Sequence, residues 1–435
     1  MTACELSIVI PALNEEGNIS NLLQALKPLV THIRHEIIVV DGKSADNTCA
    51  EAKREGATII VQQQPGFGAA LKEGFAHASG TWILTMDADF SHEPQSVPVM
   101  WNHRHAADII IGSRYVKGGR FVISTWRKLL SKFTNTVFSK ALSIPVKDMS
   151  GNFRLYRREV LDAIPITEQH YNVLQHILVH AYAQGFTMQE IPIHYVMRDQ
   201  GKSKLKVTKF ARAYLRTLCE LWNLRHSPAS ADYDDLAHDS WIPLQRYWQR
   251  KRVRIITDWI NGRTLDIGCG SSRIIKNSPH AIACDTAVHK LRYLQRTNHK
   301  RVSATLTHLP FTDASVDTIV NSEVIEHVPP EHIIFTEMHR VLADKGTLII
   351  GTPDYDKLAW RIIERIYDFV LPHAYADEHQ THYTKQSLFA LLKKHNFTIV
   401  DYKYICNSEL IVLCKKIPKK IPNSLAEARS FRNFR

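Results

Sequence analysis

The chain alternates short apolar runs with amphipathic stretches, and this alternation constrains its fold more than any other feature. Five apolar runs of strand length occur early in the sequence: Leu6–Ile10, Glu36–Val40, Thr58–Val61, Trp82–Met86 and Asp108–Ile111. Between them, stretches such as Ile19–Val30 and Ala69–His77 show the apolar spacing of a helix. Strands that alternate with helices predict a largely parallel sheet that binds ligands at the carboxyl ends of its strands.

The same alternation starts again in the second half of the 435 residues. The new apolar runs are Thr264–Ile267, Ala281–Cys284, Thr318–Val320 and Thr347–Ile350. We therefore predict two doubly wound α/β domains, at 1–225 and 255–415, followed by a basic tail at 416–435. The segment 226–254 between them is too rich in aromatic residues and arginine for a flexible linker, which favours a docking or lid segment.

The charge is unevenly distributed along the chain. The 55 Lys and Arg residues exceed the 43 Asp and Glu residues, for a net charge of +12. Most of the excess lies in 114–225 and in the tail, whereas the body of the second domain is close to neutral. Such a block is either a solvated face or a surface for phosphate, lipid head groups or nucleic acid.

Cysteine usage and the apolar spans predict the compartment. The seven cysteines form no C-x-x-C pair, which argues against zinc ribbons and disulfide scaffolds and favours a reducing compartment. No basic segment with an apolar stretch behind it precedes the first strand, and no uncharged span is apolar enough to cross a bilayer. We expect a cytoplasmic protein, free or attached to one face of a membrane.

Polar loops follow successive strands of the first domain. Pro11, Asn14 and Glu15 follow the first strand, Asp41 follows the second, and Asp87 and Asp89 follow the fourth. Two carboxylates spaced i, i+2 just past a strand can share one divalent cation, and oxygen ligands suit Mg²⁺ or Mn²⁺. Such an ion would neutralise a diphosphate leaving group.

These loops, in this order, resemble the family-2 glycosyltransferases and, among them, the dolichol-phosphate mannose synthase group. The likeness covers about residues 5–220 and is most specific in Ile111–Gly119, Arg127-x-x-x-Ser131-x-x-x-Asn135, Asp148–Tyr156 and Arg198-x-x-Gly201-x-Ser203-Lys204. The resemblance implies a GT-A fold and a nucleotide diphosphate sugar, of the GDP-mannose or UDP-glucose type, as donor.

The resemblance also assigns roles to individual residues. It implies that Pro11, Asn14, Glu15 and Asp41 bind the donor and that Asp87 and Asp89 hold the metal and the diphosphate. It implies an acceptor phosphate bound by Arg114, Arg127, Ser131, Arg198 and Lys204. Asp89, Arg114 and Arg127 are then the catalytic residues.

A chemical argument favours a polyprenyl phosphate as acceptor. A sugar hydroxyl needs a carboxylate base, whereas a phosphomonoester with a second pKa of about 6 arrives ionised and needs cations. Residues 114–158 are rich in Lys and Arg and contain one acid, Asp148, so we expect Arg114 and Arg127 to lack acidic partners there. The alternative is transfer to a lipid or glycan hydroxyl, with Asp148 as base.

The second half carries a glycine-rich loop, Asp266-Ile267-Gly268-Cys269-Gly270, between a strand and a helical pattern, and Asp285 ends the next strand. Together with Glu323–Val328, Arg340-Val341-Leu342 and Gly351-Thr352-Pro353, it resembles class I S-adenosylmethionine-dependent methyltransferases. The resemblance implies a Rossmann-like fold in which Asp266, Gly268, Gly270 and Asp285 surround the cofactor. His327 is the candidate base for an acceptor oxygen.

We therefore predict a bifunctional enzyme of cell-surface glycan or glycolipid assembly. The first domain transfers a hexosyl group to a polyprenyl phosphate with inversion, and the second methylates the sugar, the lipid or a related intermediate. Basic amphipathic stretches at Trp126–Leu142 and Leu205–Arg225 predict peripheral contact with the cytoplasmic face of a membrane. In the alternative, the second domain is a non-catalytic binding or scaffold module. Its neutral body argues against nucleic acid as a partner.

Overall fold

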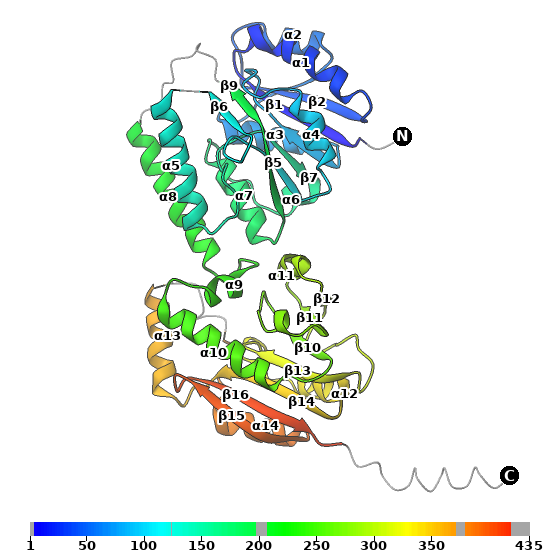
Figure 1. The fold of residues 1–435 in the computed structure, drawn as a ribbon, viewed down its shortest axis with the longest axis vertical. Helices are drawn as coiled ribbons and strands as arrows, with labels where there is room; N and C mark the ends of the chain where they lie inside the picture. The colour runs from blue at the N-terminus through cyan, green and yellow to red at the C-terminus, as the bar shows by residue number, and fades with distance from the viewer. Residues whose placement is uncertain (1–3, 123, 197–206, 371–378, 419–435) are drawn as a thin grey trace, which may run out of the picture. The chain divides into compact units, whose positions relative to one another are not determined.

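The protein folds into two compact units, Met1–Ser230 and Ala231–Arg435 (Figure 1). The computed structural model describes residues 4–122, 124–196, 207–370 and 379–418. Each unit is an α/β fold around a seven-stranded sheet. This confirms the predicted class of two α/β domains.

The first sheet has the strand order β3-β2-β1-β4-β7-β5-β8. Its strands are β1 (Leu6–Ala12), β2 (His35–Asp41), β3 (Thr58–Val61), β4 (Trp82–Thr85), β5 (Ile109–Ser113), β7 (Arg154–Arg157) and β8 (Met188–Pro192). The five predicted runs coincide with β1 to β5 to within two residues. The sheet is mixed, however, because β7 runs antiparallel to both of its neighbours, β4 and β5. A separate parallel ribbon pairs β6 (Arg120–Val122) with β9 (His194–Val196).

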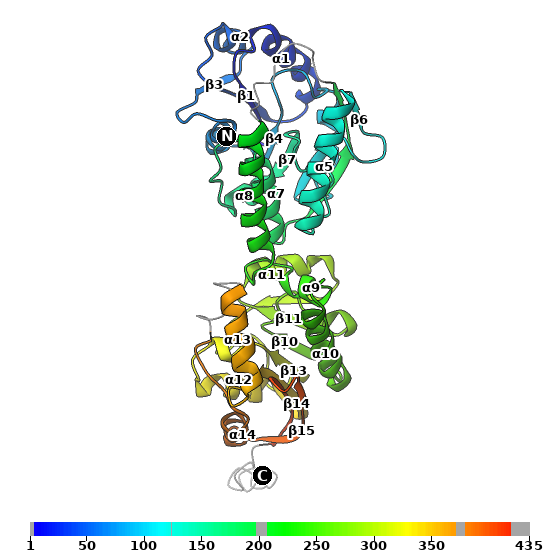
Figure 2. The same cartoon turned by 90° about the vertical axis from the view of Figure 1, so that its left-hand side faces the viewer.

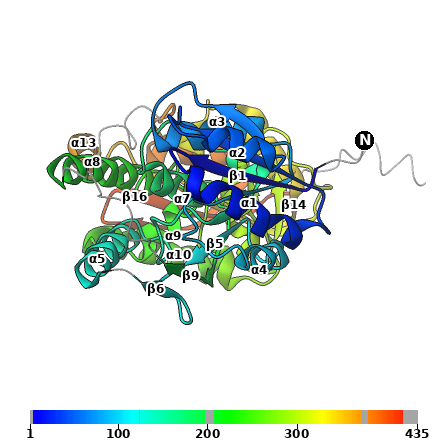
Figure 3. The ribbon, with the colours of Figure 1, turned by 90° about the horizontal axis from the view of Figure 1, so that it is seen from above.

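Helices cover both faces of this sheet. They are α1 (Glu16–Val30), α2 (Thr48–Arg54), α3 (Phe67–His77), α4 (Ser96–Asn102), α5 (Thr125–Ala141), α6 (Arg158–Asp162), α7 (Val173–Ala183) and α8 (Val207–Arg225). Helices α3 and α1 lie on opposite sides of β1 (Figure 3). Side chains of β1 alternate between two core layers: Val9 packs with α3 and α7, whereas Ile8 and Ile10 pack with α1. This two-sided burial explains the continuous apolar runs.

The second sheet has the order β12-β11-β10-β13-β14-β16-β15. Its strands are β10 (Thr264–Ile267), β11 (Ala281–Asp285), β12 (Lys300–Ser303), β13 (Val316–Ser322), β14 (Leu342–Pro353), β15 (Phe397–Ile405) and β16 (Glu409–Lys416). Strand β16 is antiparallel to β14 and β15.

The helices of the second unit also cover both faces of its sheet. They are α9 (Tyr233–His238), α10 (Pro243–Trp259), α11 (Val288–Tyr293), α12 (His332–Val341), α13 (Leu358–Val370) and α14 (Lys385–Lys394), with the short 3₁₀ helices η1 (Ile275–Asn277), η2 (Leu294–Arg296) and η3 (Ile325–His327). Helix α10 packs on one face of the sheet and α12 and α14 on the other (Figure 2).

The predicted docking segment 226–254 lies mostly within the second unit, which begins at Ala231 rather than at 255. Ile255 and Ile256 of α10 are buried in the core of that unit. Arg252, one turn earlier, forms a bidentate ion pair with Glu409 on β16, at 2.7 Å from guanidinium nitrogen to carboxylate oxygen. These contacts fasten α10 to the sheet. The predicted basic tail lies outside the described residues from position 419 onwards.

Within the described ranges, no helix has both the length and the apolar character needed to cross a bilayer.

Helix α3 approaches the sheet closely because Gly74 lacks a side chain. A Cβ atom there would overlap Val9 of β1 and lie 3.1 Å from Val40 Cγ2. We expect Gly74→Ala to destabilise the first unit by about 1–3 kcal/mol, because the core must move to admit the methyl group. Urea unfolding measures this change. Gly17→Ala on the exposed face of α1, where nothing lies within 4 Å of the new Cβ, is the matched control and should not destabilise. Equal stabilities for the two variants would contradict the close packing.

Candidate active sites of the two units

Hydrogen bonds tie together the loops after β1 and β2. The backbone N–H of Asn14 donates to Ser44 Oγ at 2.9 Å, and Asn14 Oδ1 accepts from the backbone N–H of Ala45 at 2.8 Å. The N–H of Glu15 donates to Thr48 Oγ1 at 2.8 Å. Asn14 has a positive φ of 57°, which asparagine tolerates better than most residues. Asn14, predicted to bind the donor, therefore also braces the loop.

Asp41 ends β2 and is buried. Its Oδ2 accepts from the N–H of Ser44 at 3.0 Å, whereas its buried Oδ1 has no hydrogen-bond partner among the described residues. A buried acceptor without a partner is unfavourable and marks a position where a ligand can donate. Pro11, also predicted to bind the donor, pairs with Val40 in the β1–β2 register beside this position.

Asp87 and Asp89 follow β4 and are partly exposed. Asp87 Oδ1 accepts from Asn152 Nδ2 at 3.0 Å, and Asp89 Oδ1 accepts from the N–H of Ser91 at 2.9 Å. Burial raises the pKa of Glu15, and the negative charges of Asp89 and Asp87 contribute to the rise. The three carboxylates therefore concentrate negative charge at one place, and their hard oxygens fit Mg²⁺ or Mn²⁺.

The predicted acceptor cation Arg114 is held in a buried ion pair with Asp148. Its Nε donates to Asp148 Oδ2 at 2.7 Å and its Nη2 to Oδ1 at 2.6 Å, with side chains 10% and 0% exposed. Despite burial, Arg114 holds the pKa of Asp148 below its ordinary value. The expectation that Arg114 lacks an acidic partner is therefore wrong, because β5 and the loop before β7 bring it to the one acid of that stretch.

Within the described ranges, the structure does not bring the remaining predicted acceptor residues together at one place. Ser131 accepts from the hydroxyl of Tyr115 at 2.7 Å and is joined through Asn135 to Ser150, which also binds Arg114. Arg127 is exposed in the first turn of α5. Arg198 and Lys204 lie outside the described residues.

Two residues beside Asp87 were not predicted. Asn152 binds its carboxylate, as described above, and keeps its own Oδ1 buried without a partner among the described residues. His92 is buried, its ring is stacked on Phe153, and its Nδ1 lies 3.4 Å from the N–H of Asp87. Burial lowers the pKa of His92. Asn152 lies in a motif singled out from the sequence, whereas nothing in the sequence distinguishes His92.

In the second unit, the glycine-rich loop turns sharply after β10. Gly268 and Gly270 have positive φ values of 68° and 52°. The N–H of Gly270 donates to Asp285 Oδ2 at 2.9 Å, which links the ends of β10 and β11. Asp266 is buried, its Oδ2 has no partner among the described residues, and burial together with Asp285 and Asp234 raises its pKa well above the ordinary value. The four predicted cofactor residues therefore lie together at the carboxyl ends of β10 and β11.

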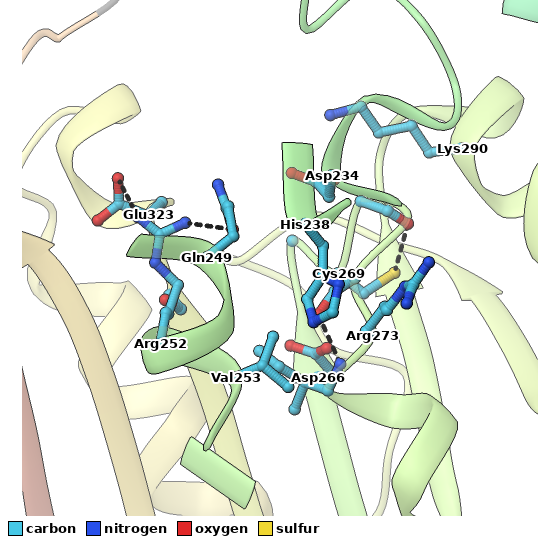
Figure 4. A pocket seen from close by; sticks show the side chains of 15 residues that line it. Asp234, His238, Gln249, Arg252, Val253, Asp266, Cys269, Arg273, Lys290 and Glu323 are labelled. Atoms are coloured by element: carbon cyan, nitrogen blue, oxygen red, sulfur yellow. Dashed lines mark hydrogen bonds and ion pairs between the residues drawn. The ribbon is translucent and has the colours of Figure 1, made fainter. Parts of the chain in front are cut away.

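A pocket of about 100 Å³ opens beside this loop (Figure 4). Helices α9 and α10 both contribute lining residues, Asp234 and His238 from α9 and Gln249, Arg252 and Val253 from α10. Asp234 accepts from the N–H of Ser271 at 2.9 Å and fills the space over Gly270. The segment predicted to dock or to act as a lid therefore contributes to the pocket.

Glu323, which follows β13 with a positive φ of 58°, also lines the pocket and lies on the same side as Gln249 and Arg252 (Figure 4). Arg252 lies between Glu323, at 3.2 Å, and Gln249 (Figure 4). Burial raises the pKa of Glu323 well above its ordinary value, with Arg252 opposing and Glu409 adding to the rise. His327, the candidate base, does not line this pocket and instead lies against the ring of His379.

Two family models match the chain. Residues 7–164 match the model described as glycosyl transferase family 2, and residues 265–350 match the model described as a methyltransferase domain. The dolichol-phosphate mannosyltransferase of Pyrococcus furiosus is 31% identical over 231 residues, which span 50% of this chain and 63% of that protein. The polyprenol monophosphomannose synthase of Mycolicibacterium smegmatis is 30% identical over 233 residues, 50% of this chain and 86% of that protein.

Solved structures also align with each half. Glucosyl-3-phosphoglycerate synthase of Mycobacterium tuberculosis, in complex with uridine diphosphate, has a TM-score of 0.41 at 20% identity, covering 50% of this chain and 80% of that one. A methyltransferase from Thermotoga maritima, described as dependent on S-adenosylmethionine, has a TM-score of 0.36 at 17% identity, covering 41% and 94%.

The ion pair between Arg114 and Asp148 yields a stability prediction. Asp148→Asn leaves the buried guanidinium without its counter-charge and should destabilise the first unit by about 3–5 kcal/mol. The contribution of Asp148 in the native chain is present above the ordinary aspartate pKa of 3.8 and is lost as the pH falls through the lower folded pKa.

Urea unfolding at pH 7 and pH 3 measures both effects. Arg216→Ala removes the exposed pair with Glu220 on α8 and serves as the control, with no measurable change expected. A loss at pH 7 no larger than that of the control would contradict a structural role for the buried pair.

Proposed function

The chain belongs to glycosyl transferase family 2 and carries a methyltransferase domain in its second half, and we propose that its first unit transfers a hexosyl group from a nucleotide diphosphate sugar to a polyprenyl phosphate. The observation that carries this proposal is that Glu15, Asp41 and the Asp87–Asp89 pair lie at or just after the ends of three neighbouring parallel strands, where one oxygen of Asp41 has no partner among the described residues. The donor is of the GDP-mannose or UDP-glucose type, and transfer inverts the anomeric carbon.

Asp87 and Asp89 would hold Mg²⁺ or Mn²⁺ there, and the ion would supply charge neutralisation for the diphosphate. The residues of the chain itself position the donor. Asn152 fixes one oxygen of Asp87, which leaves the other for ligation. Asp41 Oδ1 can accept a hydrogen bond from the nucleoside, which would satisfy this buried oxygen.

The state of Asp148 supports an acceptor that arrives already ionised. Both of its carboxylate oxygens accept hydrogen bonds from Arg114, Oδ1 also accepts from the N–H of Gly151 at 3.0 Å, and its pKa is lowered. Such a carboxylate is a poor base, which weakens the alternative of a hydroxyl acceptor. The cations proposed for the acceptor phosphate are Arg114, Arg127, Arg198 and Lys204, of which Arg114 already pairs with Asp148.

For the second unit we infer S-adenosylmethionine-dependent O-methylation of the sugar, the lipid or a related intermediate. Asp266, Gly268, Gly270 and Asp285 would surround the cofactor, and the unpartnered Oδ2 of Asp266 is an acceptor for it. Asp234, which lies against Gly270 and accepts from the N–H of Ser271, would border the bound cofactor. A non-catalytic scaffold module is the alternative.

A product assay tests the first activity. The full-length protein is incubated with polyprenyl phosphate, Mn²⁺ and radiolabelled GDP-mannose, UDP-glucose or UDP-N-acetylglucosamine, and the label extracted into organic solvent is counted. We expect label from one donor, and Asp89→Asn should reduce it by about 100-fold or more because a ligand of the ion is lost. Label that appears only on an added glycan or lipid hydroxyl would contradict the phosphate acceptor.

Calorimetry with S-adenosylmethionine is the control on the same variant. Asp89→Asn should bind the cofactor as the native chain does, since Asp89 belongs to the other unit. Loss of both properties would indicate misfolding, and absence of cofactor binding in the native chain would favour the scaffold alternative.

The outer face of α5 supports attachment to a membrane surface. Trp126 and Phe133 are 73% and 66% exposed, and Leu129 and Leu130 beside them are also exposed. Arg127, Lys128 and Lys132 lie on the same helix. Phe138, nearer the end of α5, instead packs against Tyr214 of α8. Large apolar side chains among basic ones suit the head-group region of an anionic leaflet.

We expect the protein to co-sediment with vesicles that contain phosphatidylglycerol at low salt. The double variant Trp126→Asp and Phe133→Asp should weaken this binding by about tenfold or more, because it removes two apolar anchors and adds repulsion. Trp241→Asp, which alters a side chain 75% exposed in the second unit, is the matched control. Equal binding by the double variant and this control would contradict the role of α5.

A further inference from the structure

Three side chains of metal-ligand type converge just after β13 in the second unit. Glu326 and His327 lie in the short helix η3, and His379 comes from the segment before α14. One ligand atom from each lies within 4.8 Å of the other two, and the two imidazole rings are 4.8 Å apart between centroids. Two ligand atoms that each lie about 2 Å from a shared ion are at most about 4 Å apart, so a small shift of these side chains would let them bind one ion.

Glu326 is buried, and only one of its two carboxylate oxygens has a hydrogen-bond partner among the described residues. Its Oε2 accepts from Thr352 Oγ1 at 3.1 Å, whereas its Oε1 is buried without a hydrogen-bond partner among the described residues. Its backbone oxygen accepts from the N–H of Thr381 at 3.0 Å, which ties the His379 segment to η3. A buried carboxylate oxygen without a partner is costly unless a cation or a proton compensates it.

Neighbouring groups orient His379. Tyr355 donates its hydroxyl hydrogen to Glu364 at 3.0 Å, since an ionised carboxylate only accepts. The same hydroxyl oxygen, 2.7 Å from His379 Nδ1, must therefore accept from the Nδ1 hydrogen. This arrangement makes Nε2 the nitrogen that carries the lone pair. Histidines that bind metals are commonly oriented in this way through their other ring nitrogen.

We propose that Glu326, His327 and His379 bind a divalent transition-metal ion such as Mn²⁺, Fe²⁺, Co²⁺ or Zn²⁺. Two imidazoles and one carboxylate suit these ions better than Mg²⁺, which prefers oxygen ligands. Three protein ligands leave coordination positions open for an oxygen of a small molecule. Glu326 lies three residues beyond Glu323, which lines the pocket beside the glycine-rich loop. His327 then serves as a ligand rather than as a base.

Metal binding to the full-length protein tests the proposal. The Asp89→Asn variant is used throughout, so that the carboxylates of the first unit do not compete, and it is stripped of metal with a chelator. Titration with Co²⁺ should give visible absorption bands and one bound ion, and with Mn²⁺ the electron spin echo should show coupling to imidazole nitrogen. His327→Ala and His379→Ala should each weaken binding by about 100-fold, whereas His395→Ala, outside the cluster, should leave it unchanged.

Two results would overturn the site: an absence of nitrogen coupling in the Asp89→Asn protein, or equal affinities in the cluster variants and His395→Ala. Circular dichroism checks the fold of each variant. If the alanine variants fail to fold, two other measurements test the site, and neither removes a histidine. One is the metal affinity of Glu326→Gln, which should be weakened, and the other is the nitrogen coupling of the Asp89→Asn protein. The outcome is independent of glycosyl transfer, because every protein compared carries the same Asp89→Asn change and the cluster variants alter only the second unit. A metal ion held by the other cluster of ligand-type side chains, Glu168, His176 and Glu220 of the first unit, would be unaffected by His327→Ala and His379→Ala.

Discussion

Neighbouring parallel strands must end at the same edge of their sheet, and both units depend on this constraint. In the first unit, it brings Asn14 after β1 within hydrogen-bond reach of the loop after β2. In the second, it places Gly270 after β10 against Asp285 at the end of β11. Polar groups that are far apart in the sequence therefore share a small volume. Burial and mutual repulsion then shift their pKa values, as for Glu15 and Asp266.

The parts of the fold that depend on local pattern were predictable. Apolar runs mark β1 to β5 and β10, and Asp41, Asp87 and Gly268 lie at or just after the ends of these strands, where ligands approach parallel sheets. Periodicity and turn chemistry are properties of neighbouring residues, so the sequence alone reveals them. The positive φ of Gly268 and Gly270 agrees with their place in a sharp turn.

The parts that depend on distant partners were not predictable. Strand β7 begins with Arg154, a residue atypical of a central strand, yet this side chain is fully buried and donates to the carbonyl oxygens of Leu174 and Met149. The sequence shows that Asp148 is the one acid within residues 114–158, but it does not show that Asp148 pairs with Arg114. Glu326 and His379 belong to different segments, and only the tertiary structure brings their ligand atoms together.

The position of α10 has a consequence for isolating the second unit. Arg252 binds Glu409 and Glu323, and the helix supplies both core side chains and pocket-lining residues to a sheet whose first strand starts only at Thr264. A fragment that began just ahead of that strand would lose these core side chains and leave both acids without the Arg252 counter-charge. A fragment meant to fold alone therefore has to begin at about Ala231, where the second unit starts.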